Sequence, residues 1–234
     1  PGMISPVMPV MYTRSFVIRS SANWTRYTLL DYNNGNLPDN RLGPMLSLCR
    51  FTKPGERLAA PASATVKISA VKGADKHVAR YDNLRLFYGN NTDSTFITIS
   101  SRELNIASGY LKKGRGPFEF HTIIPSASEV SIEFKGRTSP DVYTISLESD
   151  TGIIVDNVPV RGSAGLEFVM TDNEMFTTSM QHLAPDLIVM QYGLNVVRNV
   201  RSDYDYYEEG LVRQIEFLKR ASGGVPVLLV SLTD

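Results

Sequence analysis

The chain has 234 residues, of which 42% are hydrophobic and 21% charged, so it is long enough and apolar enough to bury a substantial core. Its 24 basic and 24 acidic side chains cancel, which leaves no electrostatic reason to expect nucleic acid or an anionic membrane surface as a partner. Cys49 is the single cysteine, which excludes an intrachain disulfide and a cysteine metal cluster, and no apolar run approaches the roughly 20 residues of a membrane-spanning helix.

The first 150 residues are predicted to be all-β. Apolar and polar residues alternate in several segments, and a period of two is typical of strands with one buried face. These segments are ATVKISAV (64–71), NLRLFYG (83–89), TFITIS (95–100), EVSIEF (129–134) and VYTISLES (142–149). Turn-forming stretches rich in Gly, Asn and Pro separate them, so the pattern predicts a β-sandwich or jelly roll.

After about residue 150 the pattern changes. Short apolar runs at 152–160, 187–190 and 226–232 are each predicted to be strands buried on both faces, as in a parallel sheet. Helix-compatible segments separate them, and the second one starts near Ser202 and Asp203, with acids in its first turn. The order strand, helix, strand, helix, strand predicts a parallel α/β unit with right-handed crossovers.

The boundary between these two patterns falls between Glu148 and Gly152, where no Pro/Ser-rich spacer occurs. We therefore expect a β-sandwich domain over 1–150 and an α/β domain over 151–234, packed closely together. The predicted fold class is α/β plus all-β.

Two polar turns, Arg161 to Gly165 and Gly193 to Asn195, each follow a predicted strand. If the strands are neighbours, the turns lie side by side at the carboxyl edge of the sheet, where open α/β folds bind ligands. The Gly162 backbone N–H and the Asn195 side-chain N–H would then form an oxyanion hole for acyl transfer. The alternative is that both residues have only structural roles: Gly162 allows a tight turn, and Asn195 caps the next segment.

Other side chains suggest weaker hypotheses. Trp24 and Tyr27 could form a platform that stacks on sugar rings, although aromatic residues in a sandwich are mostly core. The acids at 203–209 are spaced like metal ligands, but acids in a first helical turn are usually a solvated cap. We therefore expect no metal site.

The segments VDNVPVRGSAG (155–165) and PDLIVMQYGLNVV (185–197) resemble the second and third conserved blocks of the SGNH/GDSL esterase superfamily. They are most similar to the bacterial branch that includes peptidoglycan and polysaccharide O-acetylesterases. The resemblance implies that Gly162 and Asn195 complete the oxyanion hole and that Gly193 shapes the turn.

For the fold, this resemblance implies a partial flavodoxin-like three-layer sheet with an inserted β-sandwich. For the activity, it implies a serine carboxylic ester hydrolase without a cofactor, which removes an acetyl or other small acyl group from a carbohydrate or peptidoglycan ester. The location it implies is the periplasm or the cell surface, and the oligomeric state stays open.

The sequence departs from that family at both ends of its motif set. No Gly-Asp-Ser nucleophile block occurs, and Asp93-Ser94, the nearest string, fits a turn. The three histidines, His77, His121 and His182, are not preceded three positions earlier by aspartate, so the Asp-x-x-His block is missing too.

Without nucleophile and base the chain alone is expected to be inactive. We interpret it as the central portion of a longer esterase. The alternative is a non-catalytic carbohydrate-binding or scaffolding protein.

Overall fold

The computed structural model describes residues 2–7, 15–75, 79–102, 104–160, 162–196 and 203–231. The chain forms two compact units. Unit 1 consists of Pro1–Thr28 and Ser47–Asn157, and unit 2 of Leu29–Leu46 and Val158–Asp234. The boundary at residue 150 stays a prediction.

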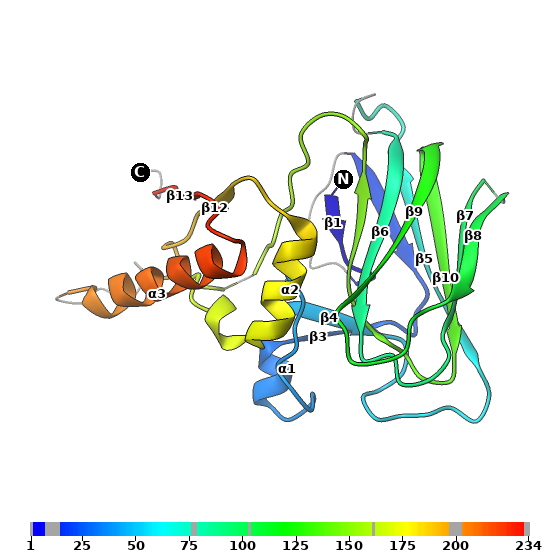
Figure 1. The fold of residues 1–234 in the computed structure, drawn as a ribbon, viewed down its shortest axis with the longest axis horizontal. Helices are drawn as coiled ribbons and strands as arrows, with labels where there is room; N and C mark the ends of the chain where they lie inside the picture. Colours follow the sequence, from blue (N-terminus) through cyan, green and yellow to red (C-terminus); the bar gives the residue numbers. More distant parts are fainter. Residues whose placement is uncertain are drawn as a thin grey trace. The chain divides into compact units, whose positions relative to one another are not determined.

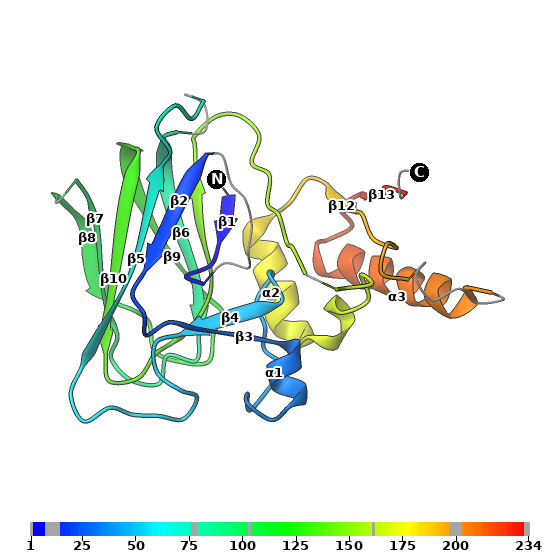
Figure 2. The same cartoon turned by 180° about the vertical axis from the view of Figure 1, so that it is seen from behind.

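Unit 1 is built from two antiparallel sheets (Figures 1 and 2). The first has the order β3-β4-β11-β6-β9, with β1 paired to β11, and the second has the order β2-β5-β10-β7-β8. The strands of unit 1 are β1 Gly2–Ile4, β2 Phe16–Ser20, β3 Thr25–Thr28, β4 Ser47–Arg50, β5 Ala62–Ala70, β6 Tyr81–Gly89, β7 Phe96–Ser101, β8 Leu104–Tyr110, β9 Phe118–Ala127, β10 Glu129–Gly136 and β11 Asp141–Glu148.

The core of unit 1 lies between the two sheets and follows from the alternating sequence. Val66, Ile132 and Ile99 pair across β5, β10 and β7, and Leu86 pairs with Ile145 across β6 and β11. All five side chains are 0% exposed and belong to one cluster. Because successive side chains of a strand point to opposite faces, the polar residues between them face outwards.

Unit 2 contains three α-helices, a 3-10 turn and two short strands among its described residues. Their bounds are α1 Leu29–Asn33, η1 Phe168–Met170, α2 Asn173–Leu183, β12 Ile188–Met190, α3 Asp205–Ala221 and β13 Val227–Leu229. The helix expected after residue 202 is confirmed as α3, although Ser202 itself lies outside the described residues. Phe176 of α2 and Phe217 of α3 pack with ring centroids 5.1 Å apart in the core of this unit.

Helix α2 begins at a buried ion pair. Asp172 caps the helix by accepting a hydrogen bond from the Met175 backbone N–H at 2.8 Å. The same carboxylate lies 3.2 Å from Nη1 of Arg41, whose side chain is only 1% exposed. The segment at 29–46 is therefore tied to a helix that lies far along the chain.

The predicted fold class is wrong in its α/β part. The parallel sheet has only two strands, β12 and β13, of three residues each, and no flavodoxin-like three-layer core is present in the described residues. The run at 152–160 contains no strand, and its Ile153 is 92% exposed. Polar residues interrupt the apolar run, and Pro159 has no backbone N–H to donate to a neighbouring strand.

The apolar character of the other two runs was also misleading. Val189 of β12 is 55% exposed and Leu228 of β13 is 51% exposed, whereas strands inside a parallel sheet are buried on both faces. Among the described residues, no helix is long and apolar enough to cross a membrane.

Candidate functional site

The two polar turns predicted from the sequence meet in unit 2. Nδ2 of Asn195 donates a hydrogen bond to the backbone carbonyl oxygen of Ser163 at 2.8 Å. Ser163 directly follows Gly162, which is exposed and has a φ of +81°, a conformation that favours glycine. Gly193, with a φ of +119°, makes the second turn. Arg161 lies outside the described residues, and the oxyanion role of Gly162 and Asn195 stays a prediction.

The first turn is held by its own side chains. Oγ of Ser163 donates to Oε2 of Glu167 at 2.5 Å and accepts from the Gly165 N–H at 2.8 Å. The Ala164 N–H donates to Oε1 of the same Glu167 at 3.4 Å. This network fixes the carbonyl to which Asn195 is bonded.

Two tyrosine side chains contact this turn. Oη of Tyr207, in α3, donates to the Ala164 carbonyl oxygen at 2.9 Å. The ring of Tyr192 lies so close to Gly165 that a Cβ there would be 2.5 Å from Cγ of the ring. Burial, followed by the nearby Glu167 carboxylate, raises the pKa of both tyrosines above the ordinary value, so both stay neutral hydroxyls near pH 7.

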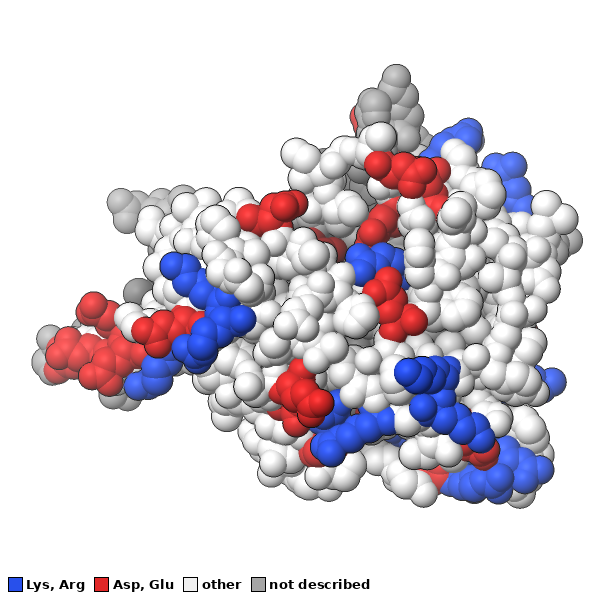
Figure 3. Space-filling model, in the orientation of Figure 1, with Lys and Arg blue, Asp and Glu red and all other residues white. Residues whose placement is uncertain are grey.

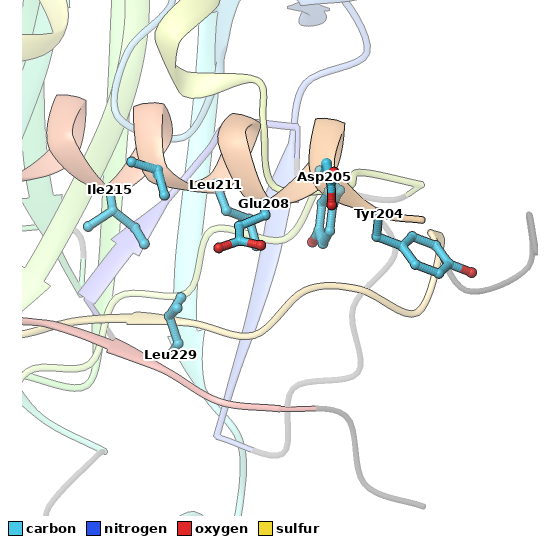
Figure 4. Close-up of a pocket in the computed structure, with 8 residues that line it drawn as sticks. Tyr204, Asp205, Glu208, Leu211, Ile215 and Leu229 are labelled. Carbon is cyan, nitrogen blue, oxygen red and sulfur yellow. The ribbon is translucent and has the colours of Figure 1, made fainter. Parts of the chain in front are cut away.

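A hollow of about 390 Å³ lies beside α3 (Figure 4), lined by Tyr204, Asp205, Tyr207, Glu208, Leu211, Val212, Ile215 and Leu229. A second hollow, of about 310 Å³, shares Tyr207, Leu211 and Leu229 with it and adds Tyr192. Gly162 and Asn195 line neither of them.

Of the residues considered as nucleophile or base, Asp93, Ser94 and His121 make local contacts in unit 1. In unit 1, the Ser94 backbone N–H donates to Oδ1 of Asp93 at 2.8 Å, and Asp93 pairs with Arg57 at 3.1 Å, so this string forms the turn that the sequence predicts. Nε2 of His121, on β9, lies 2.9 Å from Oδ1 of Asn83. His182 is an exposed residue in the last turn of α2, and His77 lies outside the described residues.

Trp24 and Tyr27 lie in the core of unit 1. Trp24 is 7% exposed and packs edge-on against Phe51 and Phe134, while its Nε1 donates to the Thr65 carbonyl oxygen at 3.1 Å. Tyr27, on β3, is 8% exposed. Both side chains are therefore largely buried, and their sugar-stacking role stays a prediction.

Both acidic and basic side chains appear on the face shown in Figure 3. Within unit 1, Arg85 pairs with Glu119 at 2.6 Å and with Glu148 at 3.4 Å. Within the described parts of the chain, no group of three or more His, Cys, Asp or Glu side chains is placed to hold a metal ion.

Sequence reasoning missed an exposed tyrosine of unit 1 that packs against a half-buried phenylalanine. Tyr110, at the end of β8, is 71% exposed, and its ring centroid lies 5.0 Å from that of Phe96 on β7. The available signal was an aromatic residue at an outward position directly before the turn at 112–117.

No family model and no curated protein matches this chain. Among solved structures, a peptidoglycan O-acetylesterase is similar with a TM-score of 0.63 and 15% identity, over 97% of this chain and 57% of its own. A family two carbohydrate esterase from Cellvibrio japonicus, at 10% identity, covers 92% of this chain and 78% of its own, with a TM-score of 0.29.

A family 35 carbohydrate-binding module from Paenibacillus barcinonensis covers 57% of this chain and 93% of its own, with 10% identity and a TM-score of 0.37. Only the first of these three likenesses is strong enough to show a shared fold. It extends over both units, and the chain spans 57% of the length of that O-acetylesterase.

Proposed function

We propose that this chain is a non-catalytic carbohydrate-binding or scaffolding part of a carbohydrate O-acylesterase. The observation that carries the proposal is the shared fold with a peptidoglycan O-acetylesterase, which includes both units but only 57% of that protein. The roles of Ser94 in a turn and of His121 beside Asn83 support a chain that lacks its own nucleophile and base. A periplasmic or cell-surface location would suit such a substrate.

The test uses the purified chain in two assays. We expect retention on O-acetylated peptidoglycan and on a neutral polysaccharide. With p-nitrophenyl acetate, we expect no more product than the Asn195→Ala variant releases. Retention on no carbohydrate would contradict the binding role. Ester turnover that Asn195→Ala removes would show that the chain itself is a catalyst.

A second candidate function is acyl-ester hydrolysis in which this chain supplies the oxyanion donors. The hydrogen bond from Asn195 Nδ2 to the Ser163 carbonyl favours it. An amide nitrogen carries two protons, so this bond orients the side chain and leaves its second N–H for a developing oxyanion. Gly162, one residue before Ser163, would supply the backbone donor. The nucleophile and the base would lie outside this chain.

This candidate is tested in a protein that joins the chain to Gly-Asp-Ser and Asp-x-x-His segments. Asn195→Ala should lower kcat for p-nitrophenyl acetate on the order of 100-fold, because one oxyanion donor is lost. Asn36→Ala is the matched control, since Asn36 is another exposed asparagine of unit 2. A loss of less than about twofold on Asn195→Ala would exclude the oxyanion role.

A further inference from the structure

The outer face of the sheet β2-β5-β10-β7-β8 carries an ordered set of polar side chains around the exposed Tyr110 and the half-buried Phe96. Strand pairing places Lys135, Phe96 and Tyr110 in one row across β10, β7 and β8. The next row contains Glu133, Thr98 and Ser108, and the row after it contains Ser131, Ser100 and Asn105. The face therefore combines an aromatic end with rows of hydroxyl and amide groups.

Tyr110 is oriented before any ligand arrives. Its ring meets Phe96 at an interplanar angle of 75°, an edge-to-face arrangement that restricts its rotation. With 71% of the residue exposed, the ring still meets solvent. A ring held in this way loses little conformational freedom when it stacks on a ligand.

The face carries both acidic and basic side chains. Nζ of Lys67 lies 2.8 Å from Oε1 of Glu129, and Oγ of Ser69 donates to Oε2 of the same carboxylate at 3.2 Å. The hydrogen bond from Lys67, followed by that from Ser69, lowers the pKa of Glu129, so it stays ionised and paired near pH 7. The outward charged residues of β2, β5 and β10 are Arg19, Lys67, Lys135, Glu129 and Glu133, and the exposed Arg102, directly after β7, also acts on Glu129. Because two acids lie among these bases, the face attracts a polyanion only weakly and a polycation not at all.

We propose that this face binds an uncharged polysaccharide chain, with Tyr110 stacked on the apolar face of one pyranose ring. Sugar hydroxyls would then meet the hydroxyl and amide side chains of the neighbouring rows. Strand β8 is the last strand of its sheet in the described part of the chain, and the outer backbone edge of such a strand offers further donors and acceptors. The inference deepens the proposed carbohydrate-binding role and rests on it, because it names the surface and the ligand class.

A second copy of the chain is the competing occupant, since an exposed strand edge can pair with another strand. The outward residues of β7 and β8 in these rows are mostly polar, with Thr98, Ser100, Ser108 and Asn105 beside the two rings. A protein interface usually has a more apolar centre than such a surface provides.

The test measures binding of the full chain to chitohexaose, cellohexaose and polygalacturonic acid by calorimetry. The two neutral ligands should bind more tightly than the polyanion. Tyr110→Ala should weaken binding of the neutral ligands by about tenfold or more, whereas Tyr110→Phe should stay within about threefold because the ring is kept. Tyr32→Ala is the matched control, since Tyr32 is an exposed tyrosine of unit 2, and it should leave binding unchanged.

The outcomes separate the two proposals. If the chain binds a neutral polysaccharide and a folded Tyr110→Ala variant binds it equally, this face is not the site, but the carbohydrate-binding role stands. Binding to none of the three ligands would overturn the proposal for this face, and the carbohydrate-binding role would fall with it only if the chain were also not retained on O-acetylated peptidoglycan. Tighter binding of the polyanion would overturn the neutral ligand class. A dimer that Tyr110→Ala converts to a monomer would assign the face to self-association.

Discussion

The two units differ in how their strands are buried. In unit 1, strands such as β5 and β10 run for nine and eight residues, and their inward side chains are fully buried between two sheets. In unit 2, β12 and β13 have three residues each, and Val189 and Leu228 remain about half exposed. Alternation thus identifies a strand together with its buried face, whereas the apolar runs at 187–190 and 226–232 identified strands but not their degree of burial.

The largest effect should come from the core of unit 1. Phe134 is 0% exposed and its ring lies 5.4 Å from that of Trp24. Phe134→Ala should lower the free energy of unfolding by about 3–5 kcal/mol, because it removes buried surface and leaves a cavity. Urea unfolding followed by tryptophan fluorescence measures this unit selectively, since Trp24 is the one tryptophan of the chain.

The neighbouring substitution Lys135→Ala is the control, because Lys135 is exposed on the same strand and should change stability by no more than about 0.5 kcal/mol. Equal effects of the two substitutions would mean that unit 1 lacks the packed core described above.

A somewhat smaller effect is expected in unit 2, at the ion pair where helix α2 begins. Asp172→Ala removes the cap of α2 and leaves the buried guanidinium of Arg41 without this partner. We expect a loss of about 3 kcal/mol in the stability of this unit, followed by far-UV circular dichroism.

Asp172→Asn should recover about 1 kcal/mol of this loss, since asparagine also caps helices. The control is Asp186→Ala, at an exposed aspartate of the same unit. Equal stability of the Asp172→Ala and Asp186→Ala variants would contradict the stabilising role of Asp172.

The smallest effect concerns a buried hydroxyl of unit 1. Tyr81 is 1% exposed, its Oη has no hydrogen-bond partner among the described residues, and burial raises its pKa from 10.0 to about 12. Because the unfolded chain ionises first, stability present below pH 10 should fall as the pH rises towards 12. Tyr81→Phe should add about 1 kcal/mol at pH 8 and reduce this alkaline loss.

Tryptophan-detected urea unfolding at pH 8 and pH 11 measures both effects, with Tyr110→Phe as an exposed control. An alkaline loss that is the same in Tyr81→Phe as in the original chain would refute the assignment to Tyr81.

The sequence pattern predicted those strands and helices that depend on the alternation or spacing of neighbouring residues. The alternating segments became β5, β6, β7, β10 and β11, and the helix-compatible segment that starts near Ser202 and Asp203 became α3. The strand predicted at 152–160 did not form, because apolar residues alone do not provide a neighbouring strand for the segment to pair with. The long-range tie between Arg41 and Asp172 leaves no short-range signal in the sequence.

The candidate site shows the same division. The hydrogen bond from Asn195 to Ser163, directly after Gly162, agrees with the expected proximity of the two polar turns, although the described residues form a parallel sheet of only two strands instead of the expected one. Glu167 and Tyr207 could not be assigned from the sequence, because their contacts with the turn depend on the packing of η1 and α3. Tyr110 was overlooked because exposure is a property of the folded sheet.

The excursion Leu29–Leu46 has a consequence for synthesis. It leaves unit 1 after β3 and returns at β4, yet Arg41 pairs with a residue 131 positions later. On the ribosome, this segment is synthesised long before α2. Its apolar residues Leu42 and Leu46, which are buried in the folded chain, therefore stay exposed to solvent while the strands before and after them can already pair. Nascent chains halted shortly after Asn157 should therefore be more sensitive to proteases within 29–46 than the released protein.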